Sequence, residues 1–187
     1  MFIWIIIAVL LVYGVLIYNS LVSVLNHVEK SWANIDVLLK QRNDELPKLI
    51  DTCKAYMTHE AQTLERVTQA RLGIDAARQT QDIAGLAVAE ASLQSGLGSL
   101  FALAENYPDL KANQTFATLQ QRITALENQI ADRREFYNES VNINNVRIAQ
   151  FPDVIVAKLL NFERKNMLTL SPEALKDIDV SARFNRE

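Results

Sequence analysis

The chain has 187 residues with a net charge of −3, 49% hydrophobic and 22% charged content, five glycines, four prolines and one cysteine. This composition is typical of a folded chain rather than a disordered one, and it gives no basic field for a nucleic-acid partner. So few glycines and prolines disfavour an architecture of strands and turns, so we expect an all-α protein. One cysteine cannot form an internal disulfide.

The first predicted element is an apolar helix. Residues 1–18 read MFIWIIIAVLLVYGVLIY, and no charged side chain precedes Glu29. Residues 1–25 would extend roughly 37 Å as a helix, which exceeds a bilayer core of about 30 Å. A cleaved signal peptide is disfavoured because no Lys or Arg precedes Lys30. We expect an uncleaved single-pass anchor over residues 1–25. Since positive charges follow the apolar run, the N-terminus is predicted outside and the C-terminal domain in the cytoplasm.

A helical domain is predicted over residues 26–162. Its first helix continues the anchor, because apolar residues recur in heptad register from Leu21 to Tyr56, interrupted only by Arg42. Pro47 lies inside this pattern and must bend or break the helix. The register is the same on both sides of Pro47, which favours a kinked, continuous helix.

Three further helical segments follow. One ends near residues 77–81, one extends from about Asp82 to Tyr107 and is stopped by Pro108, and one extends from about Asn113 to Phe151 and is ended by Pro152. Apolar stripes of this length are buried only by lengthwise packing, so we expect an antiparallel, roughly four-helix bundle. Residues 163–187 are predicted to hold a short helix from Ser171 to Ile178 and a loose tail.

Polar residues occupy core-type positions in the predicted seams. Arg42, Arg133 and Asn144 each take such a position, and the best-attested role of such residues is to specify register. A buried ligand or ion contact is the alternative. We predict that Arg42 pairs with a carboxylate of another helix, either Glu105 or Glu127.

Asparagines crowd the end of the last long helix, next to Tyr137. Asparagine is a poor helix former, so the cluster needs a physical reason. Either these side chains form hydrogen bonds with a neighbouring helix, or they present a polar recognition face. The asparagines are Asn138, Asn142, Asn144 and Asn145.

No catalytic signature is found. The chain has no Gly-rich phosphate loop, no CxxC and no GxSxG motif. His59-Glu60 resembles the start of a zinc-protease HExxH, but Thr63 stands where the second histidine is required. A zinc site needs three or four ligands, and His27, His59 and Cys53 are the only nitrogen or sulfur ligands of the chain. We therefore expect no metal, no cofactor and no enzymatic activity.

Several ordered blocks resemble the bacterial LemA family from the anchor to about Phe162. The family pattern commonly has Arg-His where this chain reads Arg42-Asn43, and the segment after Phe162 lies outside the shared motifs. The blocks that carry the resemblance are 18–22, 32–42, 46–49, Tyr56 with His59-Glu60, 67–71, 104–113, 127–131, Arg133-Arg134, Tyr137-Asn138, Val141, Asn144 and Phe151-Pro152. The structural and interaction candidates taken from these blocks and from the seams are Trp32, Asp36, Arg42, Pro47, Glu105, Tyr107, Pro108, Lys111, Glu127, Asn128, Arg133, Tyr137, Asn138, Asn144 and Pro152.

The resemblance implies a single-pass protein of the bacterial inner membrane with a helical-bundle domain and no established biochemical activity. It also implies association with magnetosome membranes in some relatives, and genes that neighbour those of membrane proteases or TPM-domain proteins. We therefore expect a membrane-anchored, non-catalytic scaffold or adaptor that contacts the lipid bilayer and forms homo-oligomers. The alternatives are a membrane-remodelling polymer and an accessory subunit of a membrane protease or phosphatase.

Overall fold

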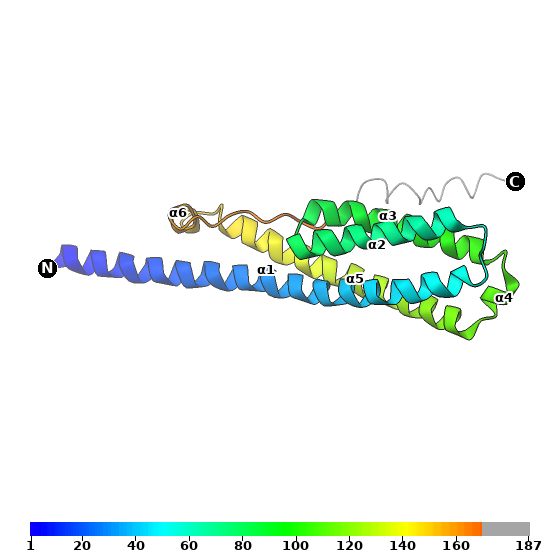
Figure 1. Ribbon diagram of the computed structural model, residues 1–187. Helices are drawn as coiled ribbons and strands as arrows, with labels where there is room; N and C mark the ends of the chain where they lie inside the picture. The colour runs from blue at the N-terminus through cyan, green and yellow to red at the C-terminus, as the bar shows by residue number, and fades with distance from the viewer. Residues whose placement is uncertain (170–187) are drawn as a thin grey trace, which may run out of the picture. The chain divides into compact units, whose positions relative to one another are not determined.

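The computed structural model describes residues 1–169, and helices are the only regular secondary structure within that range (Figure 1). The all-α prediction is confirmed. The helix predicted from Ser171 to Ile178 lies outside the described residues. The elements in chain order are α1 (Phe2–Lys54), α2 (Ala61–Thr80), α3 (Ile83–Ala104), α4 (Pro108–Lys111), α5 (Gln114–Arg147) and α6 (Asp153–Leu159).

The chain divides into two compact units. Among the described residues, the first unit consists of residues 1–36 and 131–167, and the second of residues 37–130 and 168–169. Helices α1 and α5 each contribute residues to both units.

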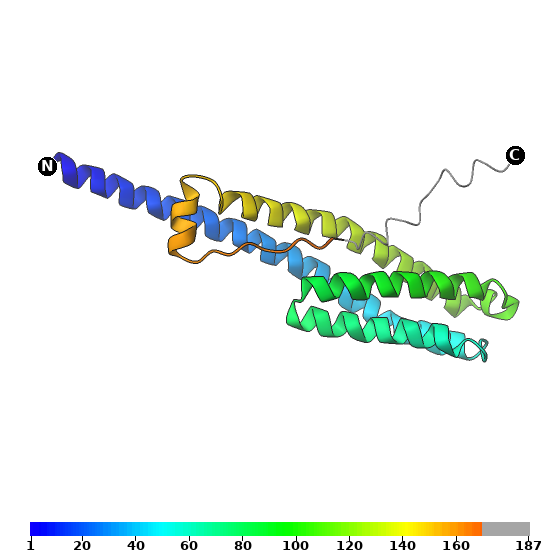
Figure 2. The same ribbon diagram turned by 90° about the horizontal axis from the view of Figure 1, so that it is seen from above.

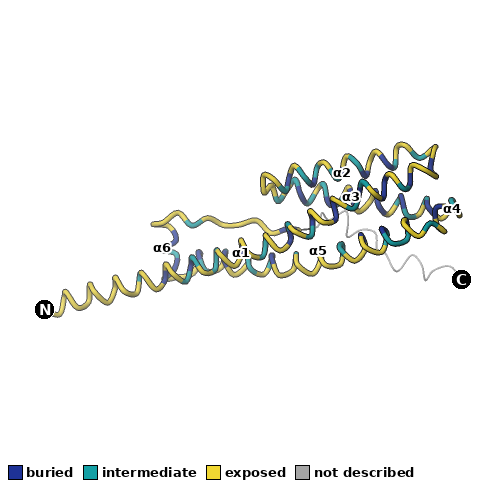
Figure 3. Tube along the Cα trace, turned by 60° about the horizontal axis from the view of Figure 1, so that its bottom comes forward, coloured by how far each residue is buried: buried dark blue, intermediate teal, exposed yellow. Residues whose placement is uncertain are grey.

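Helix α1 is continuous from Phe2 to Lys54, with Pro47 inside it, as the matching register on both sides of the proline predicts. Its beginning differs from the rest of the helix in burial. The large apolar side chains before Ile17 are exposed, whereas Ile17, Leu21 and Val28 are buried at intervals of four and seven residues (Figure 3). This N-terminal part is long and apolar enough to span a membrane.

The first unit is built on an antiparallel helix pair, α1 and the end of α5. Trp32 packs on Tyr137 with ring centroids 5.8 Å apart, and Ser31 Oγ lies 3.0 Å from Ser140 Oγ. Farther toward the N-terminus of α1, Arg147 reaches Ser20. These contacts show that α1 and α5 lie antiparallel. Helix α6 follows α5 in the chain.

The second unit is a four-helix bundle made by residues 37–54 of α1, by α2, by α3 and by residues 114–130 of α5. Only Gln81 and Asp82 separate α2 from α3, so the two helices lie antiparallel and side by side (Figure 2). Gln81 takes a left-handed conformation (φ 52°), and the Asp82 carboxylate accepts a hydrogen bond from the Gly85 amide at 3.0 Å. The core is formed by leucine-rich stripes that include Leu39, Leu46, Leu49, Leu64, Val67, Ile74, Leu86, Leu93, Leu97, Leu100, Phe116, Leu119 and Ile123.

Helix α3 is also long and apolar enough to cross a membrane. Leu86, Leu93 and Leu100 form its buried stripe, and Gly96 lies directly against Val67 of α2. Because this apolar surface is used in packing within the bundle, we assign α3 to the bundle core.

Two helix ends differ from the predictions. Helix α3 ends at Ala104, and Pro108 begins the short helix α4 because proline fits the first turn of a helix. Helix α5 ends at Arg147, four residues before the predicted end. Phe151, predicted to be the last seam residue, is 81% exposed. Helix α6 after Pro152 was not predicted, because seven residues are too short to show a helical period.

Candidate functional site

A buried ion pair lies in the second unit. The Arg42 guanidinium of α1 binds the Glu90 carboxylate of α3 through both terminal nitrogens, and Nη1 lies 3.1 Å from Oε2. The side chains are 4% and 6% exposed. The prediction that Arg42 is buried and pairs with a carboxylate of another helix is therefore correct in kind. The predicted partners, Glu105 and Glu127, are wrong.

Glu127 of α5 is close enough to feel this pair. Burial raises the pKa of the Glu127 carboxyl, the positive charge of Arg42 lowers it and the negative charge of Glu90 raises it, and the net direction is upward. The interior of the bundle thus brings together one cation and two carboxylates from three helices. A buried ion pair of this kind can specify how the helices align along one another.

A second polar interaction joins α1 to α2 and is a consequence of Pro47. A proline has no N–H to donate, so the carbonyl four residues earlier, that of Asn43, lacks its helical hydrogen bond. Arg71 Nε of α2 donates to this Asn43 carbonyl at 3.1 Å, and Asn43 Nδ2 donates in return to the Arg71 carbonyl at 3.1 Å. Pro47 itself is half-buried. The helix is uninterrupted at Pro47 because a neighbouring helix satisfies the free carbonyl.

The loop after α3 is fixed by contacts near the start of α2. Tyr107, whose side chain is half-buried, donates its hydroxyl to Glu60 at 3.4 Å. Glu105 forms an exposed ion pair with Lys111 instead of reaching Arg42, because it lies just beyond the last residue of α3. Pro108 starts α4. These four candidates, which belong to one sequence block, therefore stabilise a turn.

The predicted polar face at the end of α5 binds the chain itself. The Asn145 side chain pairs with both backbone groups of Lys165: Nδ2 donates to the carbonyl at 2.9 Å, and Oδ1 accepts from the amide at 2.9 Å. Tyr137 donates its hydroxyl to the Asn166 carbonyl at 3.0 Å. Asn144 is 2% exposed and donates to Asn145 Oδ1. Asn145 and Tyr137 thus bind an extended segment, residues 162–167.

Arg133 is the clear error among the core predictions. Its side chain is exposed and lies over the Phe136 ring, 5.8 Å from the centroid. In the first unit α5 packs on α1 as a pair, which buries a narrower stripe than a four-helix bundle does, and Arg133 falls outside it. The remaining candidates do not form one site. Trp32 packs on Tyr137, and Asp36 and Asn138 are half-buried. Asn128 is exposed, and Pro152 precedes α6.

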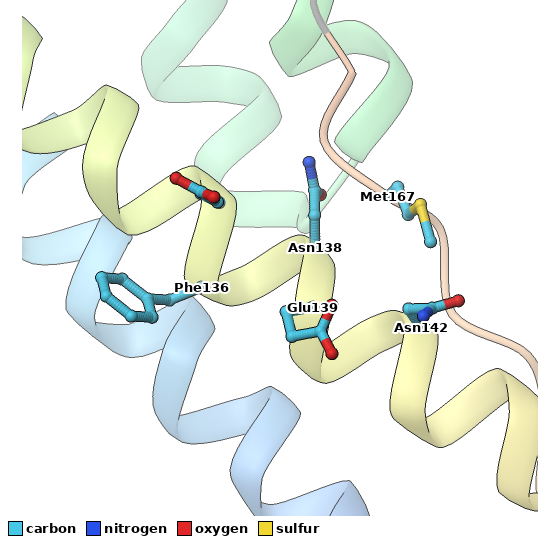
Figure 4. A pocket seen from close by; sticks show the side chains of 6 residues that line it. Phe136, Asn138, Glu139, Asn142 and Met167 are labelled. Atoms are coloured by element: carbon cyan, nitrogen blue, oxygen red, sulfur yellow. The ribbon is translucent and has the colours of Figure 1, made fainter.

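Two open grooves lie on the described part of the chain. One, of about 610 Å³, lies along α5 between Phe136, Glu139 and Met167 of the extended segment (Figure 4). Another, of about 690 Å³, lies between α2 and α3 and is lined mainly by small residues, with Val88 66% exposed. Within residues 1–169, no group of His, Cys, Asp and Glu has the geometry to hold a metal ion.

Glu90, Asn43 and Arg71 are the residues that sequence reasoning missed. Glu90 had a readable signal, because it continues the spacing of Leu86 and Leu93 along the apolar face of α3. Asn43 had one as well, since it stands four residues before Pro47. Arg71 had none, because its role depends on how α2 aligns against α1.

A family model described as the LemA family matches residues 31–182. Among curated proteins, the chain is 22% identical to magnetosome protein MamQ 2 of Paramagnetospirillum magneticum, over 83% of this chain and 65% of that protein. It is 26% identical to protein LemA of Metamycoplasma hominis, over 87% of this chain and 74% of that protein. The chain thus spans somewhat less than two thirds of the length of the magnetosome relative. The names of these relatives state no catalytic activity.

Proposed function

The chain belongs to the LemA family, and from this premise we propose that it is a membrane-anchored, non-catalytic helical scaffold that associates with itself. The N-terminal part of α1 supports the anchor, because it presents large apolar side chains on all sides until Ile17. A helix that is apolar all round needs an apolar surrounding, which a bilayer provides. This is the observation that carries the proposal. The N-terminus is proposed to lie outside and the bundle in the cytoplasm of a bacterial cell.

The interior of the bundle supports a scaffold rather than an enzyme. Arg42 and Glu90 bind each other, Asn43 and Arg71 bind each other, and none of the four lines the grooves along α5 or between α2 and α3. General acid–base chemistry requires such groups to face a substrate site. Buried polar pairs of this kind specify how helices align. A well-defined alignment is what a binding surface requires.

The groove between α2 and α3 is the proposed self-association surface. Its lining includes Ala70, Gly73, Ala77 and Ala89, which allow a helix to approach closely. Val88 supplies an exposed apolar contact in the same groove. A second copy of the chain, held in the same membrane by its own anchor, would be present at high effective concentration. Membrane proteases or TPM-domain proteins are proposed as further partners on the strength of the family resemblance alone.

Light scattering coupled to size exclusion tests this proposal on the full chain in lipid nanodiscs or mild detergent. We expect a discrete multiple of the 21.1 kDa chain. Val88→Glu should reduce the mass toward the monomer, whereas Leu72→Glu, at an exposed apolar position outside the groove, should leave it unchanged. A monomeric parent chain would refute self-association. A broad distribution of very large species would favour the membrane-remodelling polymer instead.

A further inference from the structure

We propose that residues 151–160, called here the interfacial segment, form a second membrane contact that lies in the headgroup region of an anionic bilayer beside the point where α1 leaves it. The segment contains α6. The inference rests on the proposed anchoring by α1, and it adds a lipid-binding surface in the same unit.

The interfacial segment presents an apolar stripe. Phe151, Ile155 and Leu159 are 81%, 60% and 78% exposed, and their spacing of four places the last two on one face of α6. The opposite face of the helix is buried at Asp153 and Ala157. Large apolar side chains gathered on the outer face of a short helix are typical of helices that lie in a membrane interface.

Packing places this stripe next to the end of the apolar run. Ala157 forms a buried cluster with Ile17 and Leu21 of α1 and Ile148 of α5, and Val156 and Phe162 pack against it. The ring of Phe162 meets that of Tyr18 edge to face, with centroids 6.4 Å apart. The run of apolar residues ends at Tyr18, and the polar residues Asn19 and Ser20 follow. The interfacial segment therefore sits at the level where an anchored α1 passes from hydrocarbon to headgroups.

Arg147 fixes the start of α6 at this level. Its Nε donates to Asp153 Oδ2 at 2.6 Å, and its Nη2 donates to Ser20 Oγ at 2.8 Å. One side chain thus links α5, α6 and α1. The short helix is held against α1 at both ends, by Arg147 at its start and by the Phe162 contact just after its end.

The charges around the stripe favour an anionic surface. Lys158 lies in the interfacial segment and is exposed, and Arg164 and Lys165, also exposed, follow shortly after it in the chain, with Glu163 as the exposed acidic residue among them. Asp153 is neutralised by Arg147. Anionic headgroups attract such exposed basic side chains near a membrane surface. Because α6 packs beside the end of the apolar run of α1, the observations favour the bilayer over a second protein copy as the partner of the stripe.

Fluorescence quenching by brominated lipids tests the proposal on the full chain. Leu159→Cys and Ile155→Cys would carry an environment-sensitive fluorophore, with Leu10→Cys in the anchor and Leu72→Cys on α2 as controls. Cys53 needs no replacement, because it is fully buried and burial raises the pKa of its thiol to about 11. The unsubstituted chain serves as the labelling blank. The protein would be reconstituted in vesicles of phosphatidylcholine with phosphatidylglycerol.

We expect the label at Leu159 or Ile155 to shift to the blue and to lose emission most strongly when bromine lies near the glycerol end of the acyl chain. The label at Leu10 should lose emission most strongly with bromine deep in the chain, and the label at Leu72 should show neither effect. Vesicles of phosphatidylcholine alone should weaken the quenching at Leu159.

Four results would overturn the inference in distinguishable ways. Quenching at Leu10 without quenching at Leu159 or Ile155 would leave the anchor intact and refute the membrane contact of α6. A blue shift at Leu159 without quenching would assign the stripe to a protein partner, such as a second copy. The absence of quenching at Leu10 would refute the anchor, and with it the proposed function. Quenching at Leu159 that is equal in neutral vesicles would refute the role of anionic headgroups.

Discussion

The buried ion pair predicts an asymmetry between its two partners. Removing Glu90 leaves the Arg42 guanidinium with Glu127, a second carboxylate whose pKa already responds to Arg42. Removing Arg42 leaves two carboxylates and no cation in the same interior. Breaking a buried pair by removing one partner typically costs about 3–5 kcal/mol. We therefore expect Glu90→Gln near the lower end of that range and Arg42→Met near its upper end.

Two further variants test how strongly Arg42, Glu90 and Glu127 are coupled. Glu90→Leu combined with Arg42→Met replaces the pair by apolar groups, and we expect it to cost far less than the sum of the single changes, because no charge is left buried alone. Glu127→Gln should restore part of the stability lost in Arg42→Met, since it removes one of the two uncompensated carboxylates.

The assay is urea denaturation of the full chain in detergent at neutral pH, followed by far-ultraviolet circular dichroism. The free energies of unfolding of the single and combined variants form a double-mutant cycle. Glu90→Gln being at least as destabilising as Arg42→Met would contradict the role of Glu127. Additive losses in the double variant would show that the two side chains do not act as a pair.

The remaining predictions concern packing and titration in the bundle. The folded pKa of Glu127 lies above the ordinary 4.5. Its contribution to stability is therefore present below pH 4.5 and is lost as pH rises through the folded pKa. Glu127→Gln should flatten the fall of the urea midpoint above pH 4.5, and an unchanged slope would refute this. Asn43→Leu should cost about 0.5–1.5 kcal/mol by removing the hydrogen bond that Asn43 Nδ2 donates to the Arg71 carbonyl, whereas Asn43→His, which keeps a donor, should cost less in the same denaturation. Gly96→Val should cost about 1–3 kcal/mol through overpacking, since even a Cβ there would lie 3.1 Å from Val67 Cγ2. Gly98→Ala, which meets nothing within 4 Å, should instead raise the thermal midpoint; equal effects at the two glycines would contradict the α2–α3 packing.

Sequence periodicity determined much of the fold because apolar residues spaced by three and four must be buried together. The register from Leu21 to Cys53 predicts the buried face of α1, including Arg42, and the same register across Pro47 predicts one continuous helix. Burial of one charged residue on a seam also predicts that a carboxylate lies opposite. These inferences depend only on the local pattern of one helix.

Pairing between helices could not be predicted in the same way. The choice of Glu105 or Glu127 as the partner of Arg42 ignored the axial alignment of α3, which places Glu90 opposite Arg42 and leaves Glu105 beyond the helix end. The exposure of Arg133 depends on how many helices surround α5 at that level. The residue pattern of one helix does not contain this information. The clamp of Asn145 on Lys165 joins residues of α5 to a segment without periodicity.

Alkaline carbonate extraction of membranes from cells that produce the full chain tests the central claim most directly. The claim is that the N-terminal part of α1 crosses the bilayer. We predict that the chain stays in the membrane pellet and is released only by detergent, because its exposed apolar residues before Ile17 lie in hydrocarbon. Leu10→Arg, in the middle of the run, should increase the released fraction, and Leu72→Arg on α2 should not. Release of the unsubstituted chain into the carbonate supernatant would contradict the account.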